Sequence, residues 1–146
     1  MTGPVFVDTN VLIYALDKAD PKKHLAAREW RAELWSRREG RISFQVLEEF
    51  YAQVRHKWPN ARQQARSELR DLLAWRPVVI DGTLLEQAWK VQDRFPMSFW
   101  DALIVAAAKA ASCRCLLSED FQDGQDLDGL RVVSPFRHQA RSFFSL

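Results

Sequence analysis

Short apolar runs alternate along the chain with longer segments whose apolar residues recur every three or four positions. The short runs predict strands and the longer segments predict helices. The runs are 4–7, 41–44, 77–80, 114–117 and 131–133. One helical segment has a regular apolar stripe, made by Leu47, Phe50, Tyr51, Val54 and Trp58. Strands that alternate with helices predict an α/β fold with a central parallel sheet of four or five strands.

Several residues mark where the predicted helices begin and end. Asp20 is expected to be an N-cap, because Pro21 follows it in the first helical position. Gly40 is expected to end that helix. Ser98 begins another helix, whose residues 102–108 are all apolar. A helix that is apolar on nearly every side is expected to be buried.

Composition limits the class of protein. The chain has 146 residues, of which 47% are hydrophobic, so we expect a single domain over 1–146. No signal peptide is recognisable, and the longest apolar run is far too short to cross a bilayer, which predicts a cytoplasmic protein. Cys113 and Cys115 are too close in sequence for a good disulfide and have no neighbouring His for zinc, so we expect buried thiols.

Acidic residues follow two of the predicted strands. Asp8 comes directly after the run 4–7, and Asp120 follows the run 114–117 after two intervening residues. The carboxyl ends of parallel strands meet at one edge of the sheet, where such folds bind ligands. We therefore expect both carboxylates at that edge.

Two helices are expected to bring further acids to the same place. Helices that connect parallel strands run antiparallel to them, so their N-termini lie at the carboxyl edge of the sheet. Asp101 is in the first turn of one helix, and Glu48 and Glu49 are near the start of another. Four distant segments therefore each place an acid near one edge.

Such a cluster requires a counter-charge, since several ionised carboxylates repel one another in a small space. No Cys or His accompanies these acids, so the available ligands are hard oxygens, which suit Mg²⁺ or Mn²⁺ rather than zinc. Mg²⁺ held by few carboxylates keeps water ligands and can bind a phosphate. The cluster therefore predicts phosphodiester hydrolysis.

Each acid also has a structural explanation. Asp8 could simply cap the next helix, and Asp101 fits a capping-box pattern. Glu48 and Glu49 both lie off the apolar stripe, and Asp120 belongs to an acidic loop, so solvated positions would explain these three. The convergence of four segments on one edge is what favours a site.

Four segments resemble, in order, the acidic motifs of PIN-domain nucleases. They read VDTNVLIY at 7–14, SFQVLEEFY at 43–51, SFWDALI at 98–104 and LLSEDF at 116–121. Each motif alone has limited specificity, but four in this order across nearly the whole chain are specific. The residues of these motifs and the length of the chain are most similar to those of VapC-like toxins of toxin–antitoxin pairs.

The resemblance implies which residues are catalytic. The acids that bind the metal would be Asp8, Glu49, Asp101 and Asp120, with Asp123 as an optional further ligand. The acid of the second motif usually precedes an aromatic residue, which favours Glu49 over its neighbour.

The resemblance also implies a fold, an activity and partners. Ser118 would help to orient the site, whereas Thr9 and Asn10 are expected to shape the turn rather than touch the metal. The fold would be a PIN-like three-layer α/β/α sandwich, and the activity would be RNA cleavage with Mg²⁺, for which Mn²⁺ could substitute. The partners would be an antitoxin protein that covers the active site and a second copy of the chain.

Basic and aromatic residues could contact RNA. Arg62, Arg66 and Arg70 recur every four positions and predict a basic ridge on one helix face. An ordinary solvated face explains the ridge as well. Trp100, next to Asp101, could stack on a base, although packing at the helix start is the simpler interpretation.

Two other classes of function compete with this hypothesis. A non-catalytic PIN domain that binds RNA or acts as a scaffold would not need its acids, so the intact set disfavours it. A receiver-like signalling domain would use Asp81, after the run 77–80, as its phosphoacceptor, but no later run is followed by the Lys that it requires.

Overall fold

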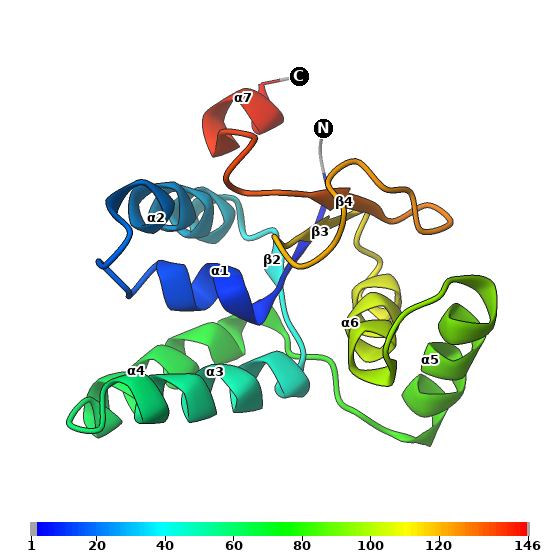
Figure 1. Cartoon of the computed structure of the whole chain (residues 1–146), viewed down its shortest axis with the longest axis horizontal. Helices are drawn as coiled ribbons and strands as arrows, with labels where there is room; N and C mark the ends of the chain where they lie inside the picture. Colours follow the sequence, from blue (N-terminus) through cyan, green and yellow to red (C-terminus); the bar gives the residue numbers. More distant parts are fainter. Residues whose placement is uncertain (1–2, 146) are drawn as a thin grey trace.

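A four-stranded parallel sheet lies at the centre of the computed structural model, which describes residues 3–145 (Figure 1). Its strands are β1 (Val5–Val7), β2 (Gly40–Arg41), β3 (Cys115–Leu117) and β4 (Arg131–Val133), in the order β2-β1-β3-β4. Each neighbouring pair is parallel, and the register aligns the last residues of β1, β3 and β4. The carboxyl ends of the strands therefore meet at one edge.

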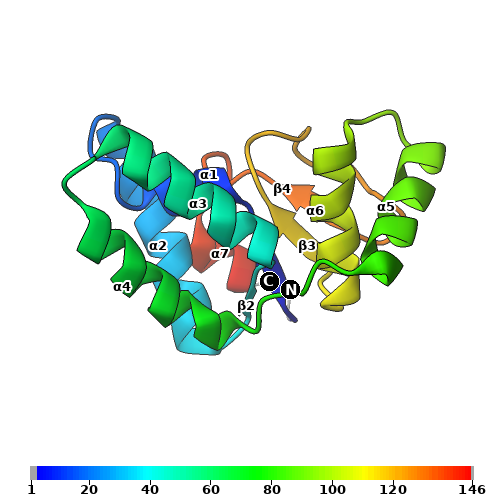
Figure 2. The same cartoon turned by 90° about the horizontal axis from the view of Figure 1, so that it is seen from below.

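Helices flank both faces of this sheet. They are α1 (Thr9–Tyr14), α2 (Pro21–Arg37), α3 (Phe44–Lys57), α4 (Arg62–Leu72), α5 (Gly82–Arg94), α6 (Phe99–Ala110) and α7 (Ala140–Phe144), with a 3-10 turn η1 (Leu73–Trp75) after α4. Figure 2 shows α1 to α4 on one side of the strands and the pair α5 and α6 on the other. The predicted three-layer α/β/α architecture is confirmed.

Side-chain caps fix the start of several helices. The Asp20 carboxylate accepts a hydrogen bond from the Lys23 N–H at the start of α2, and Pro21 is the first helical residue, as predicted. Ser98 likewise accepts from the Asp101 N–H at the start of α6.

The end of α2 differs from the prediction. The helix ends at Arg37, and Arg38 has a left-handed conformation with φ 57°. Gly40 is the first residue of β2 instead, directly beneath the Trp75 indole, where an added Cβ would come within 2.6 Å of the ring. The prediction that Gly40 caps the helix is wrong, because this glycine is needed for close approach of a side chain.

The predicted strand at 77–80 is also wrong. Only Val78 pairs, through an isolated parallel bridge to Ser43, since its N–H donates to Ile42 and its carbonyl accepts from Phe44. The chain enters α3 immediately after this bridge, so no extended partner remains for a longer strand. The same geometry shortens the predicted strand 41–44 to Gly40–Arg41.

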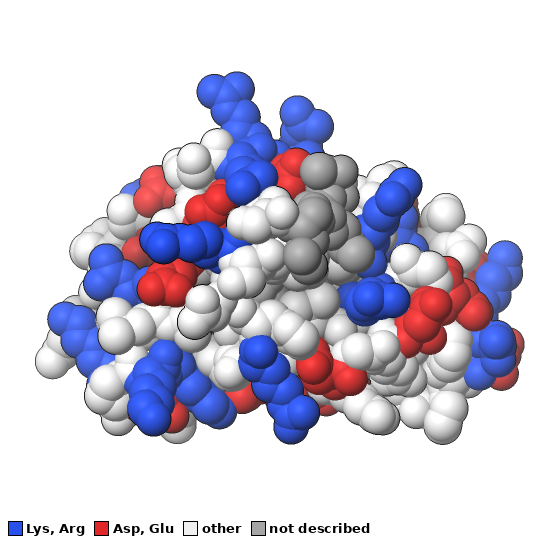
Figure 3. All heavy atoms as spheres, turned by 90° about the horizontal axis from the view of Figure 1, so that it is seen from above, with Lys and Arg blue, Asp and Glu red and all other residues white. Residues whose placement is uncertain are grey.

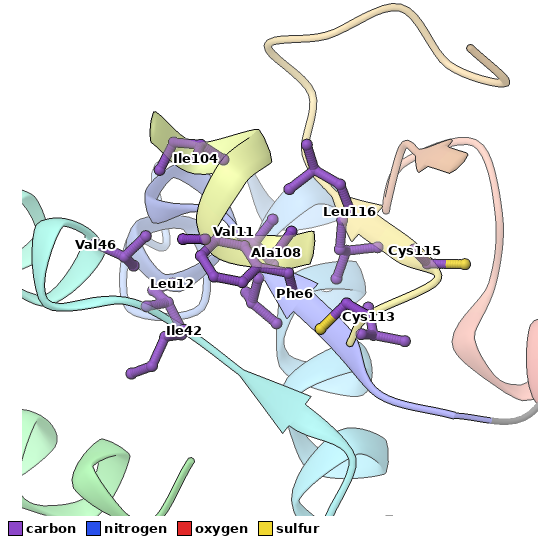
Figure 4. Packing of buried hydrophobic residues seen from close by; sticks show 14 of the residues in the cluster. Phe6, Val11, Leu12, Ile42, Val46, Ile104, Ala108, Cys113, Cys115 and Leu116 are labelled. Atoms are coloured by element: carbon purple, nitrogen blue, oxygen red, sulfur yellow. The ribbon is translucent and has the colours of Figure 1, made fainter. Parts of the chain in front are cut away.

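The apolar core lies between the sheet and its helices. Figure 4 shows Phe6 of β1 surrounded by side chains from other elements, with Leu12, Ile42 and Leu116 also fully buried. Residues 102–108 of α6 are all buried, as predicted. Both cysteines are buried thiols, and burial raises the pKa of Cys113 to about 12.

Among the described residues, no helix combines the length and apolar character needed to cross a membrane.

Candidate active site

Asp8 occupies the junction between β1 and α1. Its backbone N–H continues the sheet by donating to the Leu117 carbonyl of β3 at 3.0 Å. One carboxylate oxygen, Oδ1, accepts from the Thr9 N–H at 2.8 Å and so caps α1. The other, Oδ2, accepts from the Ser118 hydroxyl at 2.7 Å. The carboxylate is thus a cap and faces the end of β3 at the same time.

The environment of Asp8 disfavours its ionised form. Burial raises the pKa of Asp8 to about 6, and the negative charges of Asp120 and Glu49 act in the same direction. The hydrogen bonds from Ser118 and Thr9 oppose this rise. A buried carboxylate among other carboxylates is a site that a cation would stabilise.

Glu49, in the second turn of α3, is held by residues from two helices. Its Oε2 accepts from the Thr9 hydroxyl at 2.9 Å, and its Oε1 accepts from Gln45 Nε2 at 3.1 Å. Glu48 is exposed, and no hydrogen bond or ion pair involves its side chain in the described part of the chain. The structure therefore brings Glu49, rather than Glu48, toward Asp8.

Asp101 lies in the first turn of α6, half-buried beside the same group. Burial raises its pKa, and the charges of Asp120 and Glu49 add to this effect. Gln45 also connects α6 to α3, because its amide donates to the Trp100 carbonyl at 3.3 Å. Asp101 is thus within electrostatic reach of acids from two other segments.

Asp120 completes the group from the loop after β3. Its backbone N–H donates to the Ser118 hydroxyl at 3.1 Å, which holds the loop against the strand end. Its Oδ2 accepts from Asn10 Nδ2 at 3.1 Å. The side chain itself is exposed, so Asp120 forms the open rim of the group whereas Asp8 forms its floor.

Asn10 joins three parts of the site. Its amide nitrogen lies 3.1 Å from Asp120 Oδ2, 3.2 Å from Ser118 Oγ and 3.4 Å from Asp8 Oδ2. Its amide oxygen accepts weakly from the Glu119 N–H at 3.4 Å. The expectation that Asn10 shapes the turn alone is therefore too narrow, since its side chain spans the carboxylates.

Sequence reasoning missed three residues of this network: Thr9 and Asn10 as partners of the acids, and Gln45. Their signal was present in the motifs, because Asn10 and Thr9 directly follow Asp8, and Gln45 precedes Glu49 by one helical turn.

Two predicted residue groups have other surroundings. Asp123 accepts hydrogen bonds from the Ser134 N–H at 2.8 Å and from His138, and these bonds hold its pKa low although burial raises it. Arg62, Arg66 and Arg70 are exposed on α4, which packs with α3 as a helical hairpin (Figure 1).

Two contacts near the basic ridge involve other helices. Arg66 donates to the Tyr51 hydroxyl, and the neighbouring Glu68 pairs with Arg31 of α2 rather than with the ridge. Asp81, the phosphoacceptor in the receiver hypothesis, caps α5 by accepting from the Leu84 N–H at 2.9 Å.

The donor set fits a hard divalent cation. The four carboxylates are held by hydroxyl and amide donors, and within residues 3–145 no Lys or Arg forms an ion pair with any of them. The buried Gln45 Oε1 beside them has no hydrogen-bond partner. No three Asp, Glu, His or Cys side chains in the described chain are yet close enough to enclose an ion. The residues therefore supply the ligand chemistry, and side-chain movements would have to bring the carboxylates together around the ion.

The structure is thus a parallel α/β domain whose carboxyl edge carries acids from the loops after β1 and β3 and from the first two turns of α3 and α6. The family model described as PIN domain matches residues 5–129, so this chain belongs to the PIN-domain family. No match is found among curated proteins.

Solved structures share this fold at low sequence identity. A toxin–antitoxin complex from Klebsiella pneumoniae is 21% identical, with 92% of this chain and 98% of that chain covered and a TM-score of 0.65. VapC20 of Mycobacterium tuberculosis, described as a sarcin–ricin loop cleaving toxin, is 23% identical over 77% of this chain and 86% of its own, with a TM-score of 0.59. DNA-bound VapBC from Salmonella typhimurium is 15% identical over 92% of this chain and 99% of its own, with a TM-score of 0.63.

Proposed function

We propose that this PIN-domain protein is a metal-dependent endoribonuclease and the toxin of a toxin–antitoxin pair. The observation that carries the proposal is a hydrogen-bonded network that links Asp8, Glu49 and Asp120 through Thr9, Asn10 and Ser118 and reaches the backbone of α6 beside Asp101. Within residues 3–145, none of these four acids has a basic ion-pair partner. Similarity to VapC20, which is described as a sarcin–ricin loop cleaving toxin, supports a nucleic-acid loop, and we propose RNA, as the substrate class.

The four acids are the residues that would hold Mg²⁺, with Mn²⁺ as a substitute. When bound, the ion supplies positive charge to the scissile phosphate and makes a water molecule more acidic. Ser118 and Asn10 fix the orientation of Asp8 and Asp120, and Thr9 with Gln45 does the same for Glu49. Such partners matter because a ligand that must reorient binds its ion more weakly.

Trp100 is a candidate contact for the RNA itself. Trp100, directly before Asp101, is 63% exposed, and its ring contacts the neighbouring Phe99 with centroids 5.5 Å apart, so packing at the helix start leaves much of this residue accessible. An exposed aromatic ring beside the site can stack on an unpaired base. Arg62, Arg66 and Arg70 remain candidates for phosphate contacts farther away.

We also propose two protein partners and a cellular location. An antitoxin would cover the acidic edge, and a second copy of the chain would form a homodimer. Both the RNA substrate and the antitoxin would be met in the cytoplasm. Similarity to toxin–antitoxin complexes supports the antitoxin as a partner. Co-expression with the product of the adjacent reading frame tests the antitoxin proposal. We expect the two proteins to co-purify and the complex to cleave no RNA.

RNA cleavage by the purified chain tests the enzymatic proposal. We expect cleavage with Mg²⁺, none with EDTA, and a loss of at least about 100-fold in Asp8→Asn and Asp101→Asn. Asp93→Asn, an exposed position on α5, is the charge-matched control and should cleave normally. If both site variants cleave as fast as wild type, the mechanism is wrong. RNA binding without any cleavage would support the non-catalytic alternative.

A further inference from the structure

A polar pocket lies away from the acids, where α2 ends, β2 begins and η1 ends. Its volume is about 340 Å³, and its lining consists of Trp35, Arg38, Arg41, Ala74, Trp75 and Arg76. Three arginines and two tryptophans thus line one small hollow, and no acidic side chain does. We call it the arginine–tryptophan pocket.

This pocket is at the opposite edge of the sheet from the carboxylates. Arg41 is in β2 and Arg38 lies two residues before that strand, which pairs with the first residues of β1, so both belong to the amino edge. The acids follow the carboxyl ends of β1 and β3. Figure 3 looks onto the amino-edge side of the molecule from above, and Lys and Arg side chains project together at its upper rim. A ligand in the pocket would therefore not occupy the nuclease site.

The three arginines of the pocket have no ion-pair partner among the described residues. Arg38, Arg41 and Arg76 form no ion pair within residues 3–145, whereas other arginines of the chain do. Glu39, the acid nearest in sequence, does not line the pocket, and its buried Oε2 has no hydrogen-bond partner. An anion in the hollow would supply the missing negative charge.

One of these guanidinium groups is already held in place. Arg41 Nη1 donates to the Arg38 carbonyl at 3.1 Å and to the Gly40 carbonyl at 2.8 Å. Those two bonds use the hydrogens of Nη1 and leave Nε and Nη2 without a protein acceptor in the described chain. A fixed guanidinium with unused donors is well suited to a phosphate.

The tryptophans give the pocket an aromatic wall. The two rings lie 6.1 Å apart between centroids with an angle of 40° between their planes. Trp75 is buried and rests on Gly40, whereas Trp35 is 46% exposed. An exposed indole that is supported by a buried one is a preformed surface for stacking a base.

We propose that the arginine–tryptophan pocket binds one nucleotide of a single-stranded nucleic acid, with its phosphate on the arginines and its base on Trp35. The proposal builds on the proposed RNA substrate, because a strand cleaved at the acidic edge could continue to the amino edge. An acidic peptide would satisfy the arginines alone, so the exposed indole is what favours a nucleotide.

Binding is measured without cleavage, in EDTA, with a fluorescent oligouridylate of about twelve nucleotides. The variants are Arg38→Gly and Arg76→Gly, because both residues have positive φ, at 57° and 55°, which glycine adopts readily. We expect the double variant to bind about tenfold more weakly and its salt dependence to lose roughly 1.4 in slope, the value for two contacts to a single strand. Trp35→Ala should also weaken binding about tenfold.

Controls separate this pocket from other basic surfaces. Arg94→Gln on α5 removes the same charge elsewhere and should leave binding unchanged, while Arg62→Gln with Arg70→Gln tests the α4 ridge. Inorganic tripolyphosphate is the second probe, and it should compete only weakly because it lacks a base. Unchanged oligouridylate affinity in the Arg38→Gly, Arg76→Gly double variant would overturn the proposal. Equal competition by tripolyphosphate, or unchanged affinity in Trp35→Ala, would also overturn it and leave a simple anion site.

Cleavage then distinguishes this proposal from the nuclease proposal. With Mg²⁺, the double arginine variant should raise KM for long RNA and leave kcat unchanged. If these variants lose binding but the wild-type protein does not cleave RNA, the nuclease proposal is wrong and the pocket proposal stands. If the wild-type protein cleaves RNA and the double arginine variant has the same KM, the pocket proposal is wrong and the nuclease proposal stands.

Discussion

The Ser118 hydroxyl donates a 2.7 Å hydrogen bond to Asp8, a residue 110 positions earlier in the chain. This bond joins the end of β3 to the end of β1. Asp8 is only 6% exposed, and its carboxylate also accepts hydrogen bonds from the Thr9 N–H and, at 3.4 Å, from the Asn10 amide. It opposes the effect of burial on the pKa of Asp8 without cancelling it. The fold therefore holds a carboxylate in a place where its charge is unfavourable, as binding sites for cations do.

The first prediction concerns stability and pH in the absence of divalent ions. The pKa of Asp8 rises from 3.8 to about 6 on folding, so the cost of its ionisation is absent below pH 4 and complete above pH 6. That cost is about 3 kcal/mol. In EDTA, Asp8→Asn should unfold roughly 5–10 °C above wild type at pH 8, and the two proteins should converge near pH 4. Thermal unfolding monitored by circular dichroism checks this.

The same samples test the ion. Adding Mg²⁺ at pH 8 should raise the melting temperature of wild type more than that of Asp8→Asn, because ligand binding stabilises the state that it binds. A difference between wild type and variant that does not change with pH would contradict the first prediction. Equal shifts with Mg²⁺ would contradict Asp8 as a ligand.

The second prediction concerns Asn10, whose amide lies among Asp8, Ser118 and Asp120. Asn10→Asp replaces a donor with another negative charge, so it should lower both stability and cleavage more than Asn10→Ala does. We expect at least a tenfold loss of kcat/KM in Asn10→Ala, roughly the effect of losing an outer partner of a metal ligand. Asn60→Asp, on an exposed loop, is the matched control. Indistinguishable Asn10→Ala and wild-type enzymes would remove Asn10 from the site.

The third prediction uses two adjacent acids of α3. Glu49 receives hydrogen bonds from Thr9 and Gln45, whereas Glu48 is exposed. Glu49→Gln should reduce RNA cleavage by about 100-fold, and Glu48→Gln should change it by less than about twofold. Both substitutions remove one charge at nearly the same place in the sequence, so a general charge effect would appear in both variants. Comparable losses in the two would refute the assignment of Glu49.

The pattern of the sequence was sufficient to place the four acids but not to connect them. Asp8 and Asp120 follow strands, and Asp101 and Glu49 lie in the first two turns of helices, so topology alone directs them to one edge. The contacts of Asn10 depend instead on the distance between α1 and the loop after β3, and the contact of Gln45 with Trp100 depends on the distance between α3 and α6; local pattern contains neither distance. The role of Gly40 was missed for the same reason. It depends on Trp75, a residue distant in the sequence, whose side chain packs over Gly40.

Local pattern also failed where a strand lacked a partner. The run 77–80 has the composition of a strand, yet Ser43 caps α3 and ends the neighbouring strand before more than one bridge can form. Propensity describes what a segment can form, and pairing depends on what lies beside it.

The fourth prediction concerns Trp100, the aromatic residue beside Asp101. Trp100 is 63% exposed and its ring meets Phe99 at a steep angle, with centroids 5.5 Å apart, so its removal should hardly change folding. If the ring stacks on a base of the substrate, Trp100→Ala should raise KM for RNA about tenfold while kcat and the melting temperature stay near wild type. Trp89→Ala, at an exposed tryptophan on α5, is the control and should leave KM unchanged. Trp100→Phe keeps an aromatic face and should recover most of the affinity, whereas Trp100→Leu keeps apolar area without that face and should not. Recovery by leucine as well as by phenylalanine would show that the position contributes apolar contact rather than stacking.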